Sequence, residues 1–358
     1  MENANLPFIL PERSPVTRIR QRNTAELTVS SGERTQPMAG FEDTFTDIVD
    51  YIVRITEEIW VERAVGRIYD TYDANGTVFT TGGTVRSVEA VIASTAASLH
   101  AEPDGESHHL NVAWSGDEDE GFYTSHLGYK LFTNAGSSPY GPPTGKRVGR
   151  FFVADCISRA NLIHTEWLVR DNGGVVRQLG FDLHETAQRL AEVPQAETAI
   201  VSVPTRLKGQ VPRAAFNGST ETVEGWVEHH VSEIWNRRSF DHIAFHYHPA
   251  VIAHWAGGRV AHGARNLSAL ILAMLASLPD ATMRVEHVSW SDETDGVIVA
   301  VRWVLEGTTR PGGLFGDVPA GKQVAVMGMS HLRFAGALIV EEWTIFDEVA
   351  VLTQAYRQ

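Results

Sequence analysis

The stretch "IHTEWLVRDN" at residues 163–172 returns as "IVEEWTIFDE" at residues 339–348. Both copies alternate apolar and polar residues as a half-buried β-strand does, and both reach an aspartate just after the strand pattern. Other pairs keep the same order at a spacing of 175 or 176 residues: "EEIW" at 57–60 with "SEIW" at 232–235, Gly82-Gly83 with Gly257-Gly258, Trp114 with Trp290, and "PPTGK" at 142–146 with "VPAGK" at 318–322. Matches in constant order and spacing predict one structural unit that is used twice.

Two breaks in the pattern set the expected domain bounds. Residues 1–40 are polar and interrupted by prolines, which predicts a flexible N-terminal arm. A second proline-punctuated stretch predicts a linker at 186–220. The two copies of the unit then occupy 41–185 and 221–358, in agreement with a chain of 358 residues that exceeds the usual size of one domain.

Each copy shows the same predicted order of elements. A helical segment comes first, with Ile48, Ile52, Ile55 and Ile59 at helix spacing in the first copy. A short hairpin tipped by the Gly-Gly pair follows, then a second helix, then three or four long alternating strands. Helices followed by a run of antiparallel strands are typical of the α+β class and not of βαβ units.

Composition excludes several classes of function. A formal charge of −14 without a cluster of Lys and Arg argues against a nucleic-acid or anionic-membrane partner. No apolar run approaches the length of a membrane span, and nothing at the N-terminus has the pattern of a signal peptide. The single cysteine, Cys156, lies in an alternating apolar run and reads as a small strand residue. We therefore expect a cytoplasmic protein.

The repeated segments resemble the SnoaL-like branch of the NTF2-like superfamily. The residues that carry the resemblance are "GPPTGKRVGRFFVADCISRANLIHTEWLVRDNGGVVRQLG" at 141–180 and "RWVLEGTTRPGGLFGDVPAGKQVAVMGMSHLRFAGALIVEEWTIFDEVAVLTQ" at 302–354. The resemblance implies two tandem cone-shaped α+β barrels, each with helices packed on a curved antiparallel sheet around an apolar cavity. Because such domains generally pair through their sheets, it also implies an intrachain pseudo-dimer, with further homo-oligomerisation left open.

The resemblance implies catalytic positions in both copies. Asp171 and Asp347 match the aspartate that acts as acid or base in family cyclases, and burial in an apolar cone raises a carboxyl pKa toward working pH. The alternative is a strand-end carboxylate that caps a helix or pairs with arginine. His109, in "HHLNVAW", matches the strand opening of dehydratase-like relatives, where a histidine serves as general acid or base.

Further candidates follow from residue type and strand position. In the first copy they are His126, Asp155, Arg159 and His164, and in the second they are His254, Arg302 and His331. Strand alternation places His331 and Arg333 on one face, with Arg302 as a possible neighbour across the sheet, and such a cluster can hold an anionic or enolate oxygen. The richer set of polar candidates favours the first copy as the active one, with the second as the alternative.

One departure from the family pattern bears on the reaction. Cyclases tend to carry a histidine in a turn before the "PPTGK" element, but "LFTNAG" at 131–136 and "GTTRPG" at 307–312 contain none. The absence of this histidine disfavours polyketide aldol cyclisation itself and favours a related acid/base reaction.

Metal and cofactor sites are not expected. "HIAFHYHP" contains His242 and His246 at the i,i+4 spacing that can chelate a metal on a helix, but a histidine-rich surface helix end explains it as well. No phosphate-binding loop, dinucleotide-binding turn or nucleophile elbow is present in the sequence.

The sequence thus predicts a cofactor-independent acid/base enzyme that acts on a hydrophobic oxygenated small molecule. A lyase, dehydratase or isomerase would begin by removing a proton next to a carbonyl or hydroxyl. Two alternatives remain open: an epoxide- or ester-type hydrolase in the same fold, and a non-catalytic small-molecule-binding or subunit-interaction protein.

Overall fold

The structure is a computed structural model that describes residues 5–20, 23–29, 32–194 and 214–357. Residues 195–213, most of the expected linker, lie outside these ranges. The N-terminal arm contains α1 (Thr24–Leu27). The first half comprises α2 (Ile48–Trp60), α3 (Ile68–Thr71), β1 (Tyr72–Thr80), β2 (Gly83–Arg86), α4 (Val88–Ala101), β3 (Glu106–Asp117), β4 (Gly121–Thr133), β5 (Arg147–Arg159), β6 (Leu162–Arg170), α5 (Asn172–Leu179) and α6 (Leu183–Ala191).

The second half repeats this order. It comprises α7 (Val223–Val231), α8 (His242–His246), β7 (Tyr247–Trp255), β8 (Arg259–His262), α9 (Ala264–Ser277), β9 (Thr282–Glu293), β10 (Gly296–Thr308), β11 (Gln323–Ala335), β12 (Leu338–Phe346) and α10 (Glu348–Arg357). Each strand from β7 to β12 begins 175 or 176 residues after its counterpart in β1 to β6. The α+β class predicted from the sequence is confirmed.

The strands form one sheet whose order reads β2-β1-β6-β5-β4-β3-β9-β10-β11-β12-β7-β8. The second six strands therefore mirror the first six across the β3–β9 junction. This junction is narrow, because within the described residues β3 and β9 pair only at Trp114 and Trp290. Within each half the long strands are antiparallel, while β1 pairs with β6, and β7 with β12, in parallel. The sheet is continuous, but pairing at the junction is too slight to hold the halves together.

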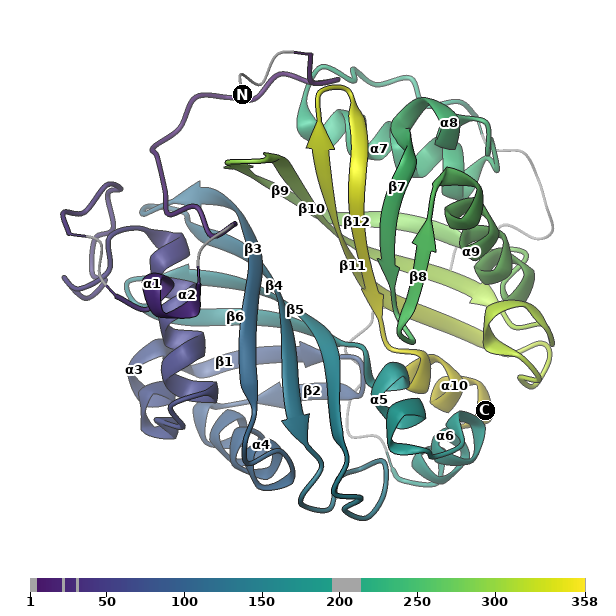
Figure 1. Ribbon diagram of the computed structural model, residues 1–358, viewed down its shortest axis with the longest axis horizontal. Coiled ribbons are helices and arrows are strands. Elements are labelled where there is room, and N and C mark those ends of the chain that lie inside the picture. The colour runs from purple at the N-terminus through teal and green to yellow at the C-terminus, as the bar shows by residue number, and fades with distance from the viewer. Residues whose placement is uncertain (1–4, 21–22, 30–31, 195–213, 358) are drawn as a thin grey trace.

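Packing between the faces of the two halves holds them instead. Figure 1 shows α2 and α4 covering one half, α7 and α9 covering the other, and the uncovered faces of the two sets of strands turned toward each other. Apolar side chains from both halves form one core there: Ala113, Leu127, Val153, Val169, Ile298, Ala300, Met327, Met329, Trp343 and Ile345. Strands such as β4 and β10 are consequently buried on both faces, which distinguishes them from the one-sided strands of an open antiparallel sheet.

The N-terminal arm packs against both halves. Phe8 contacts Trp226 and Phe334 in the core of the second half, at ring-centroid distances of 6.0 and 5.2 Å. Ile19 is buried in the core of the first half. This differs from the flexible arm expected from the sequence. Pro7, Pro11 and Pro15 disfavour regular secondary structure in the first part of the arm but leave its isolated apolar side chains free to be buried.

Arg13 joins the arm to the β3–β9 junction. Its guanidinium lies over the rings of Trp114 and Trp290, 4.0 and 3.3 Å from their centroids, and donates to the carbonyl oxygens of the same two residues. Burial lowers the pKa of Arg13 to about 9, so the group stays charged at neutral pH. One cation thereby clamps the only strand pairing that crosses between the halves in the described residues.

None of the helices in the described ranges combines the length and the apolar composition that crossing a bilayer requires.

We expect Arg13→Ala to lower the free energy of unfolding by about 2 kcal/mol, because both ring contacts and two carbonyl partners are lost together. Urea unfolding monitored by tryptophan fluorescence measures the change. Arg18→Ala is the matched control, since Arg18 is on the same arm and pairs with Asp292 at an exposed site, where about 0.5 kcal/mol or less is at stake. Similar small losses in both variants would contradict the clamp.

Candidate functional site

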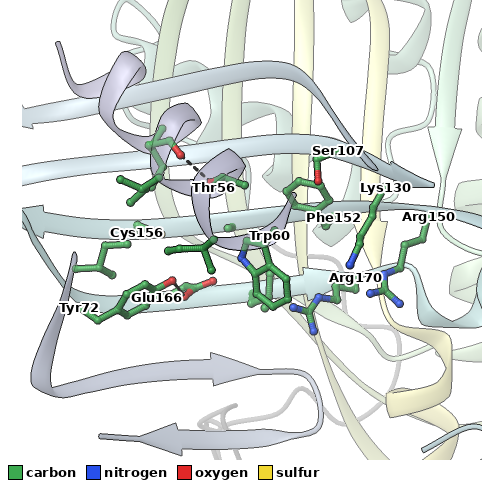
Figure 2. A pocket seen from close by; sticks show the side chains of 16 residues that line it. Thr56, Trp60, Tyr72, Ser107, Lys130, Arg150, Phe152, Cys156, Glu166 and Arg170 are labelled. Carbon is green, nitrogen blue, oxygen red and sulfur yellow. Dashed lines mark hydrogen bonds between the residues drawn. The ribbon is translucent and has the colours of Figure 1, made fainter. Parts of the chain in front are cut away.

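A pocket lies inside the first half, between α2 and the helix-facing side of the strands (Figure 2). Its wall is mainly apolar, with Ile52, Ile55, Ile59, Trp60, Phe152 and Leu168 among the lining residues. The space open to water is about 60 Å³. Cys156 also lines the pocket, and burial raises the pKa of its thiol, so it remains protonated. An apolar pocket with a few inward polar groups is the usual form of a small-molecule site.

Glu166 and Tyr72 form the acid/base pair of this pocket. The Tyr72 hydroxyl donates to Glu166 Oε2 at 2.8 Å. Only 6 % of Glu166 is exposed, and burial raises the pKa of its carboxyl despite the Tyr72 hydrogen bond and the nearby charge of Arg170. Burial likewise raises the pKa of Tyr72 well above its usual value, which keeps the phenol protonated. A carboxylate whose pKa is raised is a stronger base, which favours its exchange of a proton with a bound molecule.

Three cationic side chains occupy the other end of the pocket. Lys130 and Arg150 both pair with the buried Glu102, at 2.7 and 2.9 Å. Arg170 lies 5.5 Å from the centroid of the Trp60 ring. Burial lowers the pKa of Lys130 to about 8, an effect that Glu102 opposes. Because three cations face one carboxylate, this end carries an excess of positive charge and can hold an oxyanion or carboxylate.

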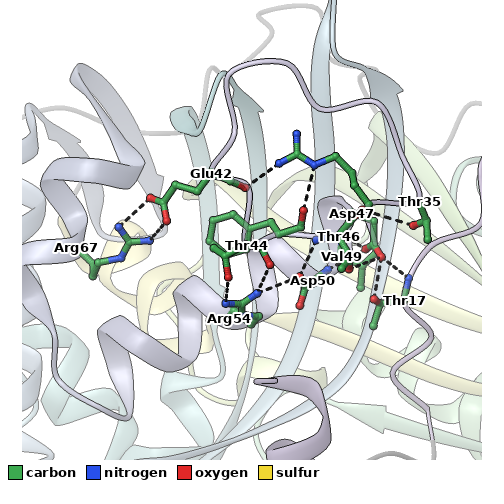
Figure 3. A network of polar contacts seen from close by, with 12 residues as sticks. Thr17, Thr35, Glu42, Thr44, Thr46, Asp47, Val49, Asp50, Arg54 and Arg67 are labelled. Carbon is green, nitrogen blue, oxygen red and sulfur yellow. Dashed lines mark hydrogen bonds and ion pairs between the residues drawn. The ribbon is translucent and has the colours of Figure 1, made fainter. Parts of the chain in front are cut away.

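The position of α2 is fixed by a network at its N-terminus (Figure 3). Asp47 caps the helix by accepting from the backbone N–H groups of Val49 and Asp50, each at 2.9 Å. The same carboxylate accepts from the backbone and hydroxyl of Thr17 on the arm, at 2.9 and 2.8 Å. Arg54 donates to the carbonyl of Thr44 at 2.7 Å. The arm therefore helps to position the helix that lines the pocket.

The second half has an equivalent but smaller pocket, with about 30 Å³ open to water. Tyr247 and Glu342 take the places of Tyr72 and Glu166, with the hydroxyl donating at 2.7 Å. Glu342 also accepts from Trp255 Nε1 at 2.8 Å and from the hydroxyl of Thr344 at 2.6 Å. The positions equivalent to the three cations are occupied by Leu305, Val326 and Phe346. Glu342 is thus fully hydrogen-bonded within the protein and has no cationic end opposite it.

Two of the predicted histidines lie beside the first pocket. His109 Nε2 is 3.2 Å from Glu57 Oε2, and His109 Nδ1 is 2.9 Å from His126 Nε2. His126 contacts Phe152, which separates it from the pocket, and neither histidine is among the residues that line the pocket. Burial lowers the pKa of His126 well below its usual value, so its ring is neutral. The chain Glu57–His109–His126 therefore supports the pocket wall.

Asp155, Arg302 and His331 meet between the halves instead of in either pocket. Arg302 Nε is 3.5 Å from Asp155, which also accepts from the hydroxyls of Tyr123 and Ser125. Burial raises the pKa of Asp155 to about 6.

His331 completes this group. Ser125 Oγ lies 2.9 Å from His331 Nε2, and Asn111 bonds its Nδ1. Burial lowers the pKa of His331 to about 3, so it is neutral. Arg302 and His331 are neighbours on one face of the sheet, as expected. That face is turned toward the first half, and the two side chains contact polar residues of the first half there.

Asp171 and Asp347 are helix caps that also bind the opposite half. Asp171 accepts from Gly174 N at 2.9 Å, and from Gly257 N and Gly258 N of the second hairpin at 2.7 and 3.1 Å. Asp347 accepts from Val349 N at 3.0 Å and from the hydroxyl of Thr81, in the first hairpin, at 2.9 Å. Neither lines the pocket of its own half. Their positions correspond to the capping alternative and differ from the catalytic one expected from the family.

The remaining candidates lie away from both pockets. His164 is 3.4 Å from Asp73 on the surface, and Arg159 is exposed at the end of β5. His254 is 3.5 Å from Glu341 and stacks on Trp343, at the wall of an open cleft of about 920 Å³ between the halves. These three residues do not come together.

Sequence reasoning missed the residues that line the first pocket with polar groups: Tyr72, Lys130, Arg150, Glu166 and Arg170. A signal was present for two of them, because Tyr72 recurs as Tyr247 and Glu166 as Glu342 at the repeat spacing. For the three cations no signal existed, since they do not recur in the second copy and lie on different strands.

Comparisons with known proteins agree with this architecture. Residues 227–355 match the model of the SnoaL-like polyketide cyclase family, which confirms the resemblance for the second half. A search of the curated proteins finds no match.

Three solved structures illustrate the structural likeness. A SnoaL-like polyketide cyclase from Agrobacterium tumefaciens is 22% identical, with 37% of this chain and 95% of that chain covered and a TM-score of 0.31. TsrD from Streptomyces laurentii is 15% identical, with 36% and 95% covered and a TM-score of 0.32. A hypothetical protein with a ketosteroid isomerase-like fold from Catenulispora acidiphila is 15% identical, with 36% and 90% covered and a TM-score of 0.30. Each solved chain corresponds to little more than a third of the present one.

We expect Asp347→Ala to lower the free energy of unfolding by about 2–3 kcal/mol, because a helix cap and hydrogen bonds to the first half are lost at once. Asp171→Ala should behave in the same way. Chemical unfolding of both variants measures the loss, and Asp182→Ala, which removes only the cap of α6, is the control at about 1 kcal/mol. A loss no larger than that of the control would show that the contacts between halves contribute nothing.

Glu166→Gln should make stability less dependent on pH. The folded-state pKa of Glu166 is raised, so the unfolded chain ionises first, and the wild type loses stability as pH rises from about 4 through the folded-state pKa. Glutamine keeps an acceptor for Tyr72 but cannot ionise. The free energy of unfolding of the variant should therefore rise relative to that of the wild type over this pH range, by about 1.4 kcal/mol for each unit of pKa difference. Urea unfolding at pH 4 and pH 8 measures this, and parallel pH profiles would show that Glu166 is not perturbed.

Proposed function

We propose, with the match of residues 227–355 to the SnoaL-like family as the premise, that the chain is a duplicated SnoaL-like protein whose first half is a cofactor-independent acid/base enzyme. In this proposal residues 41–185 and 221–358 are the two domains, and they pair within one chain as two subunits of a dimer would. The substrate is a small oxygenated molecule with an apolar body. A cytoplasmic location remains part of the proposal.

One observation supports this function above the others. The first pocket places the buried Glu166–Tyr72 pair at one end and Lys130, Arg150 and Arg170 at the other, with an apolar wall between them (Figure 2). A base separated from oxyanion-stabilising cations is the arrangement that proton removal next to a carbonyl requires.

The chemistry follows from these groups. Glu166 takes a proton from the carbon next to a carbonyl, and the electron pair of the broken C–H bond moves onto the carbonyl oxygen as an enolate. The cationic end stabilises this oxygen while the apolar wall excludes water. Return of the proton from Glu166 to another atom gives an isomerase. If the enolate instead expels a neighbouring hydroxyl group, which takes the proton from Glu166 and leaves as water, the result is a dehydratase. The positive end favours substrates with an acidic oxygen or a carboxylate near the carbonyl.

The second half is assigned a supporting role. Glu342 already receives three hydrogen bonds from protein groups, and Leu305, Val326 and Phe346 leave no cationic end. The candidates for an active second half, His254, Arg302, His331 and Asp347, lie between the halves. A hydrolase built on Asp171 or Asp347 receives no support either, because both carboxylates cap helices.

We expect Glu166→Gln to lower the rate of α-proton exchange in small β-keto carboxylates by about 10²–10⁴-fold, the usual contribution of a general base. Exchange in D₂O, followed by NMR, measures proton removal without knowledge of the natural substrate. Glu342→Gln is the matched control, and its rate should stay within about twofold of the wild type. Equal losses in both variants, or none in either, would contradict an active first half.

The same experiment separates an enzyme from a binding protein. Quenching of tryptophan fluorescence reports occupancy of the pocket, because Trp60 lines it. A wild-type protein that binds these compounds but exchanges no proton would support the non-catalytic alternative.

A further inference from the structure

Three histidines converge on the outer side of the second half. His229 comes from α7, and His242 and His246 come from successive turns of α8. One ring nitrogen of each lies within 4.8 Å of the corresponding nitrogens of the other two. The ring centroids form a nearly equilateral triangle with sides of 5.5, 5.6 and 5.8 Å, and the ring planes are steeply inclined to one another. Apolar packing of the rings alone does not require their nitrogen atoms to lie this close together.

This spacing is close to that of a tris-imidazole metal site. Zn–N bonds of ~2.0–2.1 Å at the tetrahedral angle place coordinated nitrogens about 3.4 Å apart, which small side-chain rotations reach from the present separation. In addition, the Nδ1 atom of His242 is buried and has no hydrogen-bond partner among the described residues. Burial of a polar atom without a partner costs free energy of folding, and a bound ligand at this nitrogen would remove that cost.

The surroundings supply the outer partners that metal-binding histidines normally have. His246 Nδ1 forms a hydrogen bond of 2.9 Å with His230 Nδ1, which leaves its Nε2 available. His242 Nε2 lies 3.8 Å from Glu233 Oε2, and Arg237 also pairs with that carboxylate. Such contacts fix the tautomer and the ring orientation of a ligating histidine.

The protonation state also suits a metal. Burial, together with the neighbouring histidines, lowers the pKa of His246 to about 4, and burial lowers that of His229 as well. These rings are therefore neutral at pH 7, the form that binds metal ions.

The first half fills the same positions with arginine. At the repeat spacing, Arg54 and Arg67 stand where the second half has His229 and His242, and Thr71 stands in place of His246. Arg67 pairs with Glu58 at 2.7 Å, the counterpart of Glu233. In the second half Arg237 pairs with Glu233 instead, so the place taken by Arg67 in the first half is open to an imidazole, that of His242.

We propose that His229, His242 and His246 bind one divalent transition-metal ion of the Zn²⁺ type, with water at the fourth position. Imidazole nitrogen is a preferred donor for this class of ion. The site joins α7 to α8 over the second half and is separate from the pocket of the first half. Its role is to hold these helices together, so it adds to the proposed function without depending on it.

The test is a titration of the metal-free full-length protein with Zn²⁺ by calorimetry and with Co²⁺ by visible absorption. We expect one equivalent to bind, with the intense absorption of four-coordinate Co²⁺, and the temperature of unfolding to rise with Zn²⁺. His242→Gln should weaken binding at least about 100-fold, which exceeds the upper range for losing an outer partner. His262→Gln, at an exposed histidine outside the cluster, should bind as the wild type does.

Further outcomes keep the proposal open to refutation. If His242→Gln is not folded by circular dichroism, His229→Gln, which changes a half-buried residue of α7, replaces it. The proposal is overturned if no ion binds at one equivalent, if Co²⁺ remains six-coordinate, or if the cluster variants bind as tightly as His262→Gln. Chelation should leave proton exchange in the first pocket unchanged, so failure here is distinguishable from failure of the proposed enzyme.

Discussion

Strands β4, β5, β10 and β11 are buried on both faces, because helices cover one face and the other half of the chain covers the second. Every polar side chain on these strands must then find a partner inside the protein, in a pocket or across the junction. On the face toward the junction, Asp155, Arg302 and His331 satisfy one another and their neighbours. On the face toward the helices of the first half, Lys130 and Arg150 line a pocket together with Glu166 of β6. The face on which a polar residue lies therefore determines whether it can contact a small molecule bound in the pocket.

The two halves share a framework and differ in what they place in it. The Tyr–Glu pair is present in both, at 2.8 and 2.7 Å, so its geometry belongs to the repeated unit. The cations of the first pocket are replaced by apolar side chains at the equivalent positions of the second half. On the outer surface the two halves differ as well, because two arginines of the first half correspond to histidines in the second. The two halves can therefore differ in the residues of their pockets and outer surfaces, because the packing between them needs only their common framework.

The sequence predicted the repeat, the order of the elements and the α+β class, since strand alternation, helix spacing and Gly-Gly turns are local properties. It left the role of Asp171 open between catalysis and capping, because the helix that Asp171 caps begins with Asn172-Gly173-Gly174, a weak helix-forming start, and was not expected. Alternation also predicted that His331 and Arg333 share a face, with Arg302 as a possible neighbour across the sheet. It cannot say whether that face meets helices or the other half, because both faces are equally buried.

The proposed function depends most on the first pocket being the place where a small carbonyl compound binds and reacts. A crystal structure of the protein soaked with a small β-keto carboxylate tests this directly. The account predicts the ligand in the first pocket only, with its carboxylate toward Lys130, Arg150 and Arg170 and its acidic carbon beside the carboxyl of Glu166. A ligand found in the second pocket, or in the cleft between the halves, with the first pocket empty, would contradict it.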